Sequence, residues 1–115
     1  MPELPEVETV ARGLQRRLAG RVIASVELLR PEIAFGPNRP SNELLRGRRV
    51  KEVARVGKQV QITLSGGMSI RVHLGMTGRL TVTPVREPLA KHTHLRLGFK
   101  GERVEMRFCD PRRFS

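Results

Sequence analysis

The stretch RVKEVARVGKQVQITLSGGMSIRVHL, residues 49–74, decides the fold class of this chain. Apolar and polar residues alternate along it with a period of two, as they do in half-buried β-strands. We predict strands over residues 49–56, 58–64 and 68–74, with a turn at Ser65-Gly66-Gly67 between the last two. Sequential strands joined by tight turns favour antiparallel pairing.

The same alternation predicts further strands on both sides of this stretch. Val22, Ala24, Val26 and Leu28 alternate with polar residues, and similar patterns follow the central stretch. The further strands are expected over residues 22–28, 79–83, 94–99 and 103–109. About seven short strands at close spacing favour a mainly β fold with flanking helices, a two-sheet antiparallel β-sandwich or a flattened barrel.

A long helix is predicted before the first strand, within MPELPEVETVARGLQRRLAG at residues 1–20. Its apolar residues recur at three- and four-residue spacing and form one stripe. The stripe consists of Leu4, Val7, Val10, Ala11, Leu14 and Leu18. Pro5 suits a first helical turn and Gly20 suits a helix end. A proline-rich loop at 30–41 follows, and Ser41 is expected to cap a short helix over 42–45.

The composition restricts the function classes. The chain of 115 residues suits one domain, and 22 Lys and Arg against 11 Asp and Glu give a formal net charge of +11. Such an excess is typical of proteins that bind polyanions, nucleic acid first and anionic membrane surfaces second. The single cysteine, Cys109, excludes an internal disulfide and a cysteine-rich zinc site. Because no apolar run approaches the roughly 20 residues of a membrane span, we expect no membrane partner and a cytoplasmic location.

The N-terminus carries residues that suit covalent catalysis. If Met1 is removed, Pro2 becomes a secondary amine at the start of a helix, where the helix dipole disfavours the ammonium form. An uncharged amine can attack a carbonyl-like carbon and form an imine. Glu3 and Glu6, three residues apart, lie on one side of the helix and are candidates for general acid/base work. The alternative is that Pro2 only opens the helix and that both carboxylates only complement its dipole.

Two further candidates lie in the central stretch and just after it. Lys58 is predicted to stand at a strand start, in phase with the apolar face, from where it could reach into a cleft; the alternative is a solvated edge lysine. Met76 lies between two glycines in HLGMTG, residues 73–78. An exposed apolar side chain on a basic protein can wedge into a base stack, whereas a turn methionine folded onto the core is the alternative.

The last nine residues, RFCDPRRFS, suit contact with nucleic acid. Asp110-Pro111 predicts a turn, after which Arg112 and Phe114 offer a phosphate or base contact and a stacking or inserting ring. His92 and His94 could share one face of a strand. Two histidines without a neighbouring cysteine or carboxylate are poor evidence for a metal, so we predict no metal site and favour a phosphate contact.

These segments together resemble the formamidopyrimidine-DNA glycosylase family. The matching motifs, in order and spacing, are MPELPEVET at 1–9, Gly57-Lys58, HLGMTG at 73–78, KHTH at 91–94 and DPRRF at 110–114. The likeness covers all 115 residues, but only the N-terminal catalytic domain of the family. The related endonuclease VIII group usually has glycine in place of Leu4, so the formamidopyrimidine branch fits better.

The resemblance implies a bifunctional DNA glycosylase and AP lyase of base-excision repair, with a β-sandwich fold. Its substrates would be oxidised purines, such as 8-oxoguanine and formamidopyrimidines, and its partner double-stranded DNA with oxidised or abasic sites. Pro2 would attack C1′ of the damaged nucleotide and form a Schiff base. Glu3 would be the general acid that opens the sugar ring, Glu6 would support the amine, and Lys58 would transfer protons during β-elimination.

The resemblance also implies a set of DNA-binding residues. Met76, Arg112 and Phe114 would fill the gap left by the flipped base, and His92 would bind backbone phosphate. The chain departs from the family pattern at Gln59, where a large residue such as tyrosine is common, and at Thr93, where KHDH has an acid.

The chain ends after a strand and a turn, so we expect residues 1–115 to be one domain of a larger protein. The family's second half normally carries a helix–two-turn–helix module and a four-cysteine zinc finger. We therefore expect zinc only in that missing part, no cofactor in this chain, and a monomer near the bacterial nucleoid. The isolated domain is expected to bind DNA weakly and to have little activity. The alternatives are a catalytically silent DNA-binding or damage-sensing module of the same fold and a basic RNA-associated β-domain.

Overall fold

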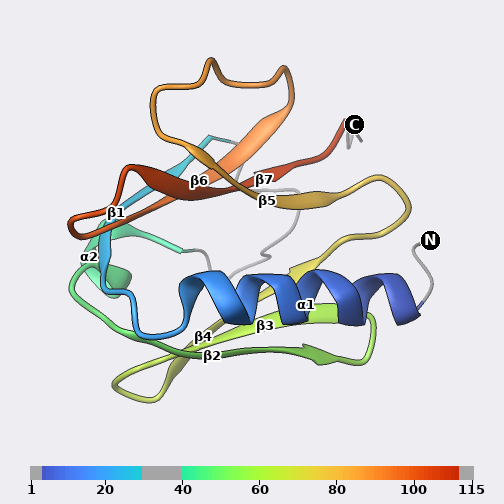
Figure 1. Cartoon of the computed structure of the whole chain (residues 1–115), viewed down its shortest axis with the longest axis horizontal. Coiled ribbons are helices and arrows are strands. Elements are labelled where there is room, and N and C mark those ends of the chain that lie inside the picture. The colour runs from blue at the N-terminus through green and yellow to red at the C-terminus, as the bar shows by residue number, and fades with distance from the viewer. Residues whose placement is uncertain (1–3, 30–39, 112–115) are drawn as a thin grey trace.

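Seven strands and two helices form the described part of this computed structural model, residues 4–29 and 40–111 (Figure 1). The helices are α1 (Leu4–Leu18) and α2 (Asn42–Leu45). The strands are β1 (Ile23–Leu28), β2 (Val50–Val56), β3 (Gln59–Leu64), β4 (Met68–His73), β5 (Arg79–Pro84), β6 (Thr93–Phe99) and β7 (Val104–Cys109). Every element predicted from the alternation of apolar and polar residues is present, with bounds shifted by one residue in most cases.

The strands form two antiparallel sheets that face each other. One sheet has the order β1-β6-β7-β5 and the other the order β2-β3-β4. Figure 1 shows the two sheets as separate layers, with α1 running along one open side between them. The prediction of a two-sheet antiparallel β-sandwich with a long N-terminal helix is confirmed.

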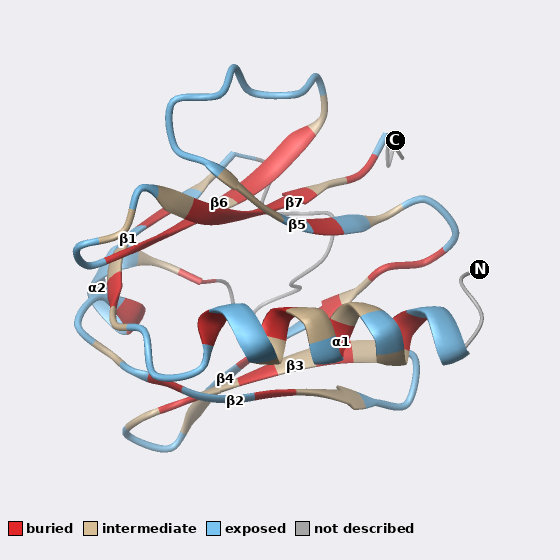
Figure 2. Cartoon of the chain, viewed as in Figure 1, coloured by how far each residue is buried: buried red, intermediate tan, exposed pale blue. Residues whose placement is uncertain are grey.

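Helix α1 buries the stripe that its sequence predicts. Val7, Ala11, Leu14 and Leu18 are buried, whereas Val10 is half-buried (Figure 2). These side chains pack against β2, β3 and β5, so the helix contacts both sheets and closes one side of the sandwich. The short helix α2 begins as expected, because the Ser41 hydroxyl accepts a hydrogen bond from the Leu44 amide at 3.2 Å.

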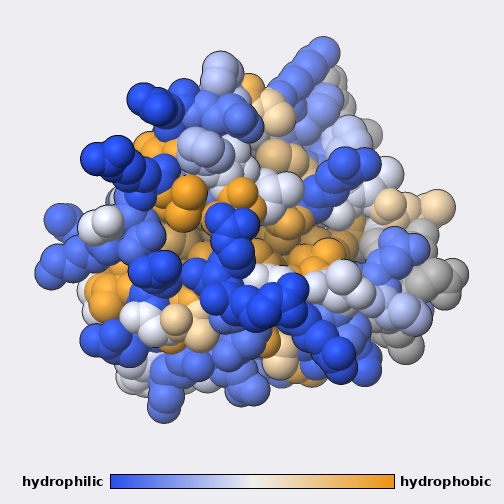
Figure 3. All heavy atoms as spheres, in the orientation of Figure 1, coloured by the Kyte–Doolittle hydropathy of each residue, from blue (hydrophilic) through white to orange (hydrophobic). Residues whose placement is uncertain are grey.

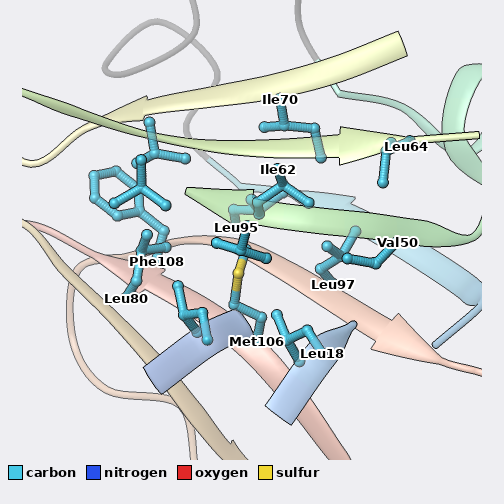
Figure 4. Packing of buried hydrophobic residues seen from close by; sticks show 14 of the residues in the cluster. Leu18, Val50, Ile62, Leu64, Ile70, Leu80, Leu95, Leu97, Met106 and Phe108 are labelled. Atoms are coloured by element: carbon cyan, nitrogen blue, oxygen red, sulfur yellow. The ribbon is translucent and has the colours of Figure 1, made fainter. Parts of the chain in front are cut away.

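The core lies between the sheets and under α1 (Figure 4). Met106 and Phe108 of β7 and Leu95 of β6 are fully buried and face Ile62 and Ile70 of the opposite sheet. Alternation explains this arrangement, since successive side chains of a strand point to opposite faces. The same alternation turns Glu105 and Arg107 of β7 to the outer face of their sheet.

Glu105 and Arg107 are buried although they lie on the outer face. Their side chains are only 5% and 4% exposed, and the Arg107 Nε donates to a Glu105 carboxylate oxygen at 2.7 Å. The Arg107 Nη2 also donates to the carbonyls of Pro84, Val85 and Glu87, at 2.9–3.3 Å. Arg107 therefore ties the connection between β5 and β6 down onto the outer face of the sheet.

We expect Arg107→Met to lower the free energy of unfolding by about 2 kcal/mol, because several loop carbonyls lose a buried donor, whereas Glu105 keeps its hydrogen bonds from Arg96. Chemical denaturation monitored by circular dichroism measures this difference. Arg103→Gln is the matched control, since Arg103 is exposed and its replacement should change stability by less than about 0.5 kcal/mol. Equal losses in the two variants would contradict this account of Arg107.

Candidate active site and nucleic-acid interface

Strand pairing brings several predicted site residues to one end of the sandwich. The pair Gln59↔His73 places the turn between β2 and β3 beside the last residue of β4. Cys109, the last residue of β7, pairs with Arg79 at the start of β5 and with Thr93 at the start of β6. The β2–β3 turn, the β4–β5 loop, the start of β6 and the end of β7 therefore lie at the same end.

A cleft of about 550 Å³ opens at this end, between α1 and β5. Its lining comes from the first turns of α1, the β4–β5 loop, β5 and the second residue after the β7 end. The lining residues are Glu6, Val10, Leu74, Met76, Thr77, Gly78, Arg79, Leu80, Thr81 and Pro111. Figure 3 shows apolar surface on this face of the molecule, framed by hydrophilic side chains. Two predicted site residues, Glu6 and Met76, thus share one cleft.

Met76 projects from a tight loop between β4 and β5. The Gly78 amide donates to the Leu74 carbonyl at 2.7 Å, and a Cβ on Gly78 would lie 2.4 Å from that same oxygen. Gly75 has a φ of 61°, a conformation that glycine adopts readily. The Met76 side chain is 76% exposed. The structure therefore contradicts the alternative in which Met76 folds back onto the core, and the wedge interpretation stays a prediction.

Lys58 lies in the turn between β2 and β3 and not at the strand start that its sequence predicts. Strand β3 begins one residue later, at Gln59, because Gly57 has a φ of 60° and Val56 pairs with Gln59 across a two-residue turn. Lys58 is exposed in this turn, so the expectation that it opens the strand is wrong, whereas its reach into a cleft stays a prediction. The turn places it on the surface, at the same end of the sheet as the last residue of β4.

Arg55 fixes the β2–β3 turn against α1. Its Nη1 donates to the Gly57 carbonyl at 3.0 Å, and its Nε donates to Glu8 of α1 at 3.1 Å. Glu8 also accepts from Arg12 at 2.9 Å, as the four-residue spacing predicts. These two guanidinium groups, Arg12 first and Arg55 second, hold the pKa of Glu8 below its ordinary value. The turn that carries Lys58 is thereby tied to the same helix that carries Glu6.

His92 lies directly before β6, in a backbone conformation with a φ of 96°, which is uncommon for a residue other than glycine. The next residue, Thr93, is buried and its hydroxyl donates to the Ala90 carbonyl at 2.7 Å. Threonine thus satisfies a local backbone acceptor at the position where the family pattern has an acid. His94 is fully buried inside β6 and His92 lies outside that strand, so the expectation that both histidines share one face of a strand is wrong.

The remaining predicted site residues are Pro2, Glu3, Arg112 and Phe114, and they lie outside the described residues. Sequence reasoning in turn missed Arg55, which orders the Lys58 turn, and the contact between Thr77 and Asp110. In that contact the Thr77 hydroxyl donates to an Asp110 carboxylate oxygen at 2.7 Å. The sequence motif at Asp110 indicates only a turn. Its carboxylate is fully buried and therefore needs hydrogen-bond partners, but this burial is visible only in the folded chain.

The described residues provide no metal site and no membrane span. Within residues 4–29 and 40–111, no group of three or more His, Cys, Asp or Glu side chains could hold a metal ion. No helix in the same ranges has the length and apolar character needed to cross a bilayer. A zinc ion therefore has no ligand set in the described part of this chain, and the expectation of zinc elsewhere stays a prediction.

Comparison with known structures supports a DNA glycosylase domain. The fold superposes on the Lactococcus lactis formamidopyrimidine-DNA glycosylase in complex with DNA containing an abasic site. The TM-score is 0.85 at 30% identity, over 98% of this chain and 41% of that chain. The same enzyme in complex with DNA containing a formamidopyrimidine lesion, Fapy-dG, gives a TM-score of 0.83 at 31% identity, over 94% of this chain and 40% of that one.

Sequence comparison narrows this class to one family. All of residues 1–115 match the formamidopyrimidine-DNA glycosylase N-terminal domain, so the chain belongs to that family. The formamidopyrimidine-DNA glycosylase of Heliobacterium modesticaldum is 45% identical over 119 residues, and that of Desulforamulus reducens is 40% identical over 117. The alignments cover the whole of this chain but only 43% and 42% of those relatives, so the chain spans about two-fifths of their length.

We expect Glu8→Gln to make the decrease in thermal stability on acidification smaller than in the parent protein. Arg12 and Arg55 lower the pKa of Glu8 from 4.5 in the folded state, so the unfolded chain binds the Glu8 proton more readily than the folded chain does. The stabilisation by these ion pairs is therefore present above pH 4.5 and is lost as the pH falls through the lower folded value. Thermal unfolding at about pH 6 and about pH 3.5 measures the difference. Glu52→Gln, at an exposed position of β2, is the control, and an equally reduced decrease in both variants would count against the Glu8 assignment.

Proposed function

We propose that this chain provides the N-terminal catalytic domain of a bifunctional DNA glycosylase and AP lyase, which removes oxidised purines such as 8-oxoguanine and formamidopyrimidines. The observation that carries the proposal is the cleft at which Glu6, Met76 and Pro111 meet. These three residues come from the three segments in which the family resemblance locates the amine and the inserting side chains. The family match over the whole chain and the DNA-bound structural neighbours support the same conclusion.

The nucleophile in this proposal is Pro2, freed by removal of Met1. Its nitrogen forms a bond to C1′ while the N-glycosidic bond breaks, and the departing base takes up the proton that the amine gives away. Glu3 then protonates O4′, the C1′–O4′ bond breaks, and the nitrogen lone pair completes an iminium to C1′. Glu6, which lines the cleft in the first turns of α1, supports this site.

The lyase step follows from the iminium. Loss of a proton from C2′ is now easy, and the electron pair moves to form a C1′–C2′ enamine and then to expel the 3′-phosphate as the C3′–O3′ bond breaks. Lys58 suits proton transfer in this step and contact with an adjacent phosphate, because it is exposed on a turn that Arg55 ties to α1. A flexible amine on a fixed turn can reach several atoms of the opened sugar.

DNA contact in this proposal uses both apolar and charged groups. Met76, together with Arg112 and Phe114, fills the space that the extruded nucleotide leaves, which offsets the lost base stacking. His92 binds a backbone phosphate. The formal net charge of +11 supplies the general attraction to the duplex. We also propose that the protein acts as a monomer in the bacterial cytoplasm, close to the nucleoid, with any zinc confined to the polypeptide beyond this domain.

Borohydride trapping tests the catalytic proposal. Full-length protein without Met1 should form a covalent complex with a duplex that contains one abasic site, because borohydride reduces the iminium to a stable amine. Pro2→Gly replaces the secondary amine with a primary one and should lower the yield of the complex, and retention of Met1 should abolish it. Denaturing gel electrophoresis and mass spectrometry of the N-terminal peptide measure both effects.

The alternative, a catalytically silent DNA-binding or damage-sensing module, makes the opposite prediction. Such a module binds the abasic duplex but gives no covalent complex, even with the Pro2 amine free. DNA binding without trapping would thus exclude the enzyme and favour the silent module. Strong trapping that is unchanged after acetylation of the N-terminus would exclude Pro2 as the nucleophile.

The affinity of the domain for duplex DNA should fall steeply with salt concentration. Each phosphate that a Lys or Arg neutralises releases a condensed counterion, so a plot of log affinity against log salt has a slope of about −0.9 per phosphate contact. Fluorescence anisotropy with an undamaged duplex between about 50 and 200 mM salt measures this slope. An affinity that does not change over this range would contradict the electrostatic part of the proposal.

A further inference from the structure

Asp110 follows the last residue of β7 and is completely buried. It lies under the cleft, between the loop that carries Met76 and the segment that carries His92. A buried carboxylate is costly unless hydrogen bonds satisfy it. The partners of its hydrogen bonds therefore show which parts of the site Asp110 holds in place.

The side chain of Asp110 reaches the Met76 loop. The Thr77 hydroxyl donates to the Asp110 Oδ1 at 2.7 Å, across 33 residues of sequence. Thr77 lines the cleft directly beside Met76. Because a hydrogen bond to a carboxylate is short and strong, it limits how far the loop between β4 and β5 can shift.

The backbone of Asp110 reaches the start of β6 twice. Its amide donates to the His92 carbonyl at 3.0 Å. Its carbonyl accepts a hydrogen bond from the Nε2 of buried His94. A carbonyl can only accept, so the proton of the His94 ring lies on Nε2, and Nδ1 has no partner among the described residues.

These bonds hold His92 in its unusual conformation. A φ of 96° in a residue other than glycine costs on the order of 1–3 kcal/mol and persists only where the surroundings fix it. The Asp110 amide fixes the His92 carbonyl, and two hydrogen bonds from Thr93 to the Ala90 carbonyl fix the turn before it. Strained backbone of this kind is concentrated at functional sites.

We propose that Asp110 is a positioning residue that holds the Met76 loop and the His92 backbone in one fixed relation at the end of β7. This inference rests on the proposed function, in which Met76 enters the base stack and His92 binds phosphate. Asp110 itself is completely buried and offers no surface to DNA. It positions Met76 through Thr77, and it positions His92 through the His92 carbonyl. Both side chains can therefore contact the duplex at the same time.

Thr77→Val tests the link to the wedge, because valine has the shape of threonine but no hydroxyl to donate. In full-length protein without Met1, single-turnover excision from a duplex with one 8-oxoguanine should slow by about tenfold, since a misplaced loop costs catalysis without removing a reacting group. Thr77→Ser keeps the hydroxyl and should restore the rate to within about twofold of the parent protein. Thr83→Val on β5 is the matched control and should leave the rate unchanged. Among the described residues, the Thr83 hydroxyl forms a hydrogen bond only with the Thr81 hydroxyl.

A double-mutant cycle separates positioning from a general loss of stability. If Asp110 acts on catalysis through Met76, then Met76→Ala with Thr77→Val should be no slower than Met76→Ala alone. A general loss of stability would instead make the two effects multiply. Thermal unfolding of each variant shows that the folded protein is compared in every case.

The outcomes distinguish this inference from the proposed function. If the parent protein neither excises 8-oxoguanine nor becomes trapped on an abasic duplex, the proposed function fails. If the parent protein is active but Thr77→Val is equally active, or if the effects of Met76→Ala and Thr77→Val multiply, the function stands and the positioning role of Asp110 is wrong. Slow excision by Thr77→Val, recovery in Thr77→Ser and a non-additive cycle support it.

Discussion

The packing of α1 between the edges of the two sheets is the constraint on which the site depends. Val7, Ala11, Leu14 and Leu18 are buried along one stripe, and full burial of a valine or leucine side chain contributes about 1.5–3 kcal/mol. The stripe fixes the rotation of the helix about its axis and its position along the sandwich. Glu6 stands directly before buried Val7, so the apolar contacts of the core determine where the start of the helix meets the cleft.

Strand register also determines where the parts of the candidate site lie. The pairs Gln59↔His73 and Arg79↔Cys109 bring turns and strand ends from both sheets to one edge of the molecule. Hydrogen bonds then determine the finer geometry there, with Arg55 tying the β2–β3 turn to Glu8, and Thr77 tying the Met76 loop to Asp110. The site is thus assembled from loops, but each loop is anchored to a helix or a strand end.

Most of the fold follows from the periodicity of the sequence, because alternation in strands and the stripe in α1 are local properties that burial converts into structure. The short helix with its Ser41 cap is equally local. Lys58 was misplaced because the tight turn, in which Gly57 has a φ of 60°, takes up one residue more than the alternation of β3 indicates. The partnership of Thr77 with Asp110 spans 33 residues, so only the folded chain reveals it, and the burial of Arg107 depends on loop carbonyls that no sequence pattern indicates.

The separation between core and loops has a consequence for how this domain can diverge. Some side chains at the cleft, such as Met76 and Thr77, belong to a connection between strands, whereas others, such as Glu6, belong to a helix. Insertions in the β5–β6 connection would disturb the hydrogen bonds of Arg107. Its guanidinium group donates to four carbonyls there, between Pro84 and Pro88. The connection between β5 and β6 is therefore expected to tolerate little change in length, because an insertion would move its carbonyls away from the Arg107 donors.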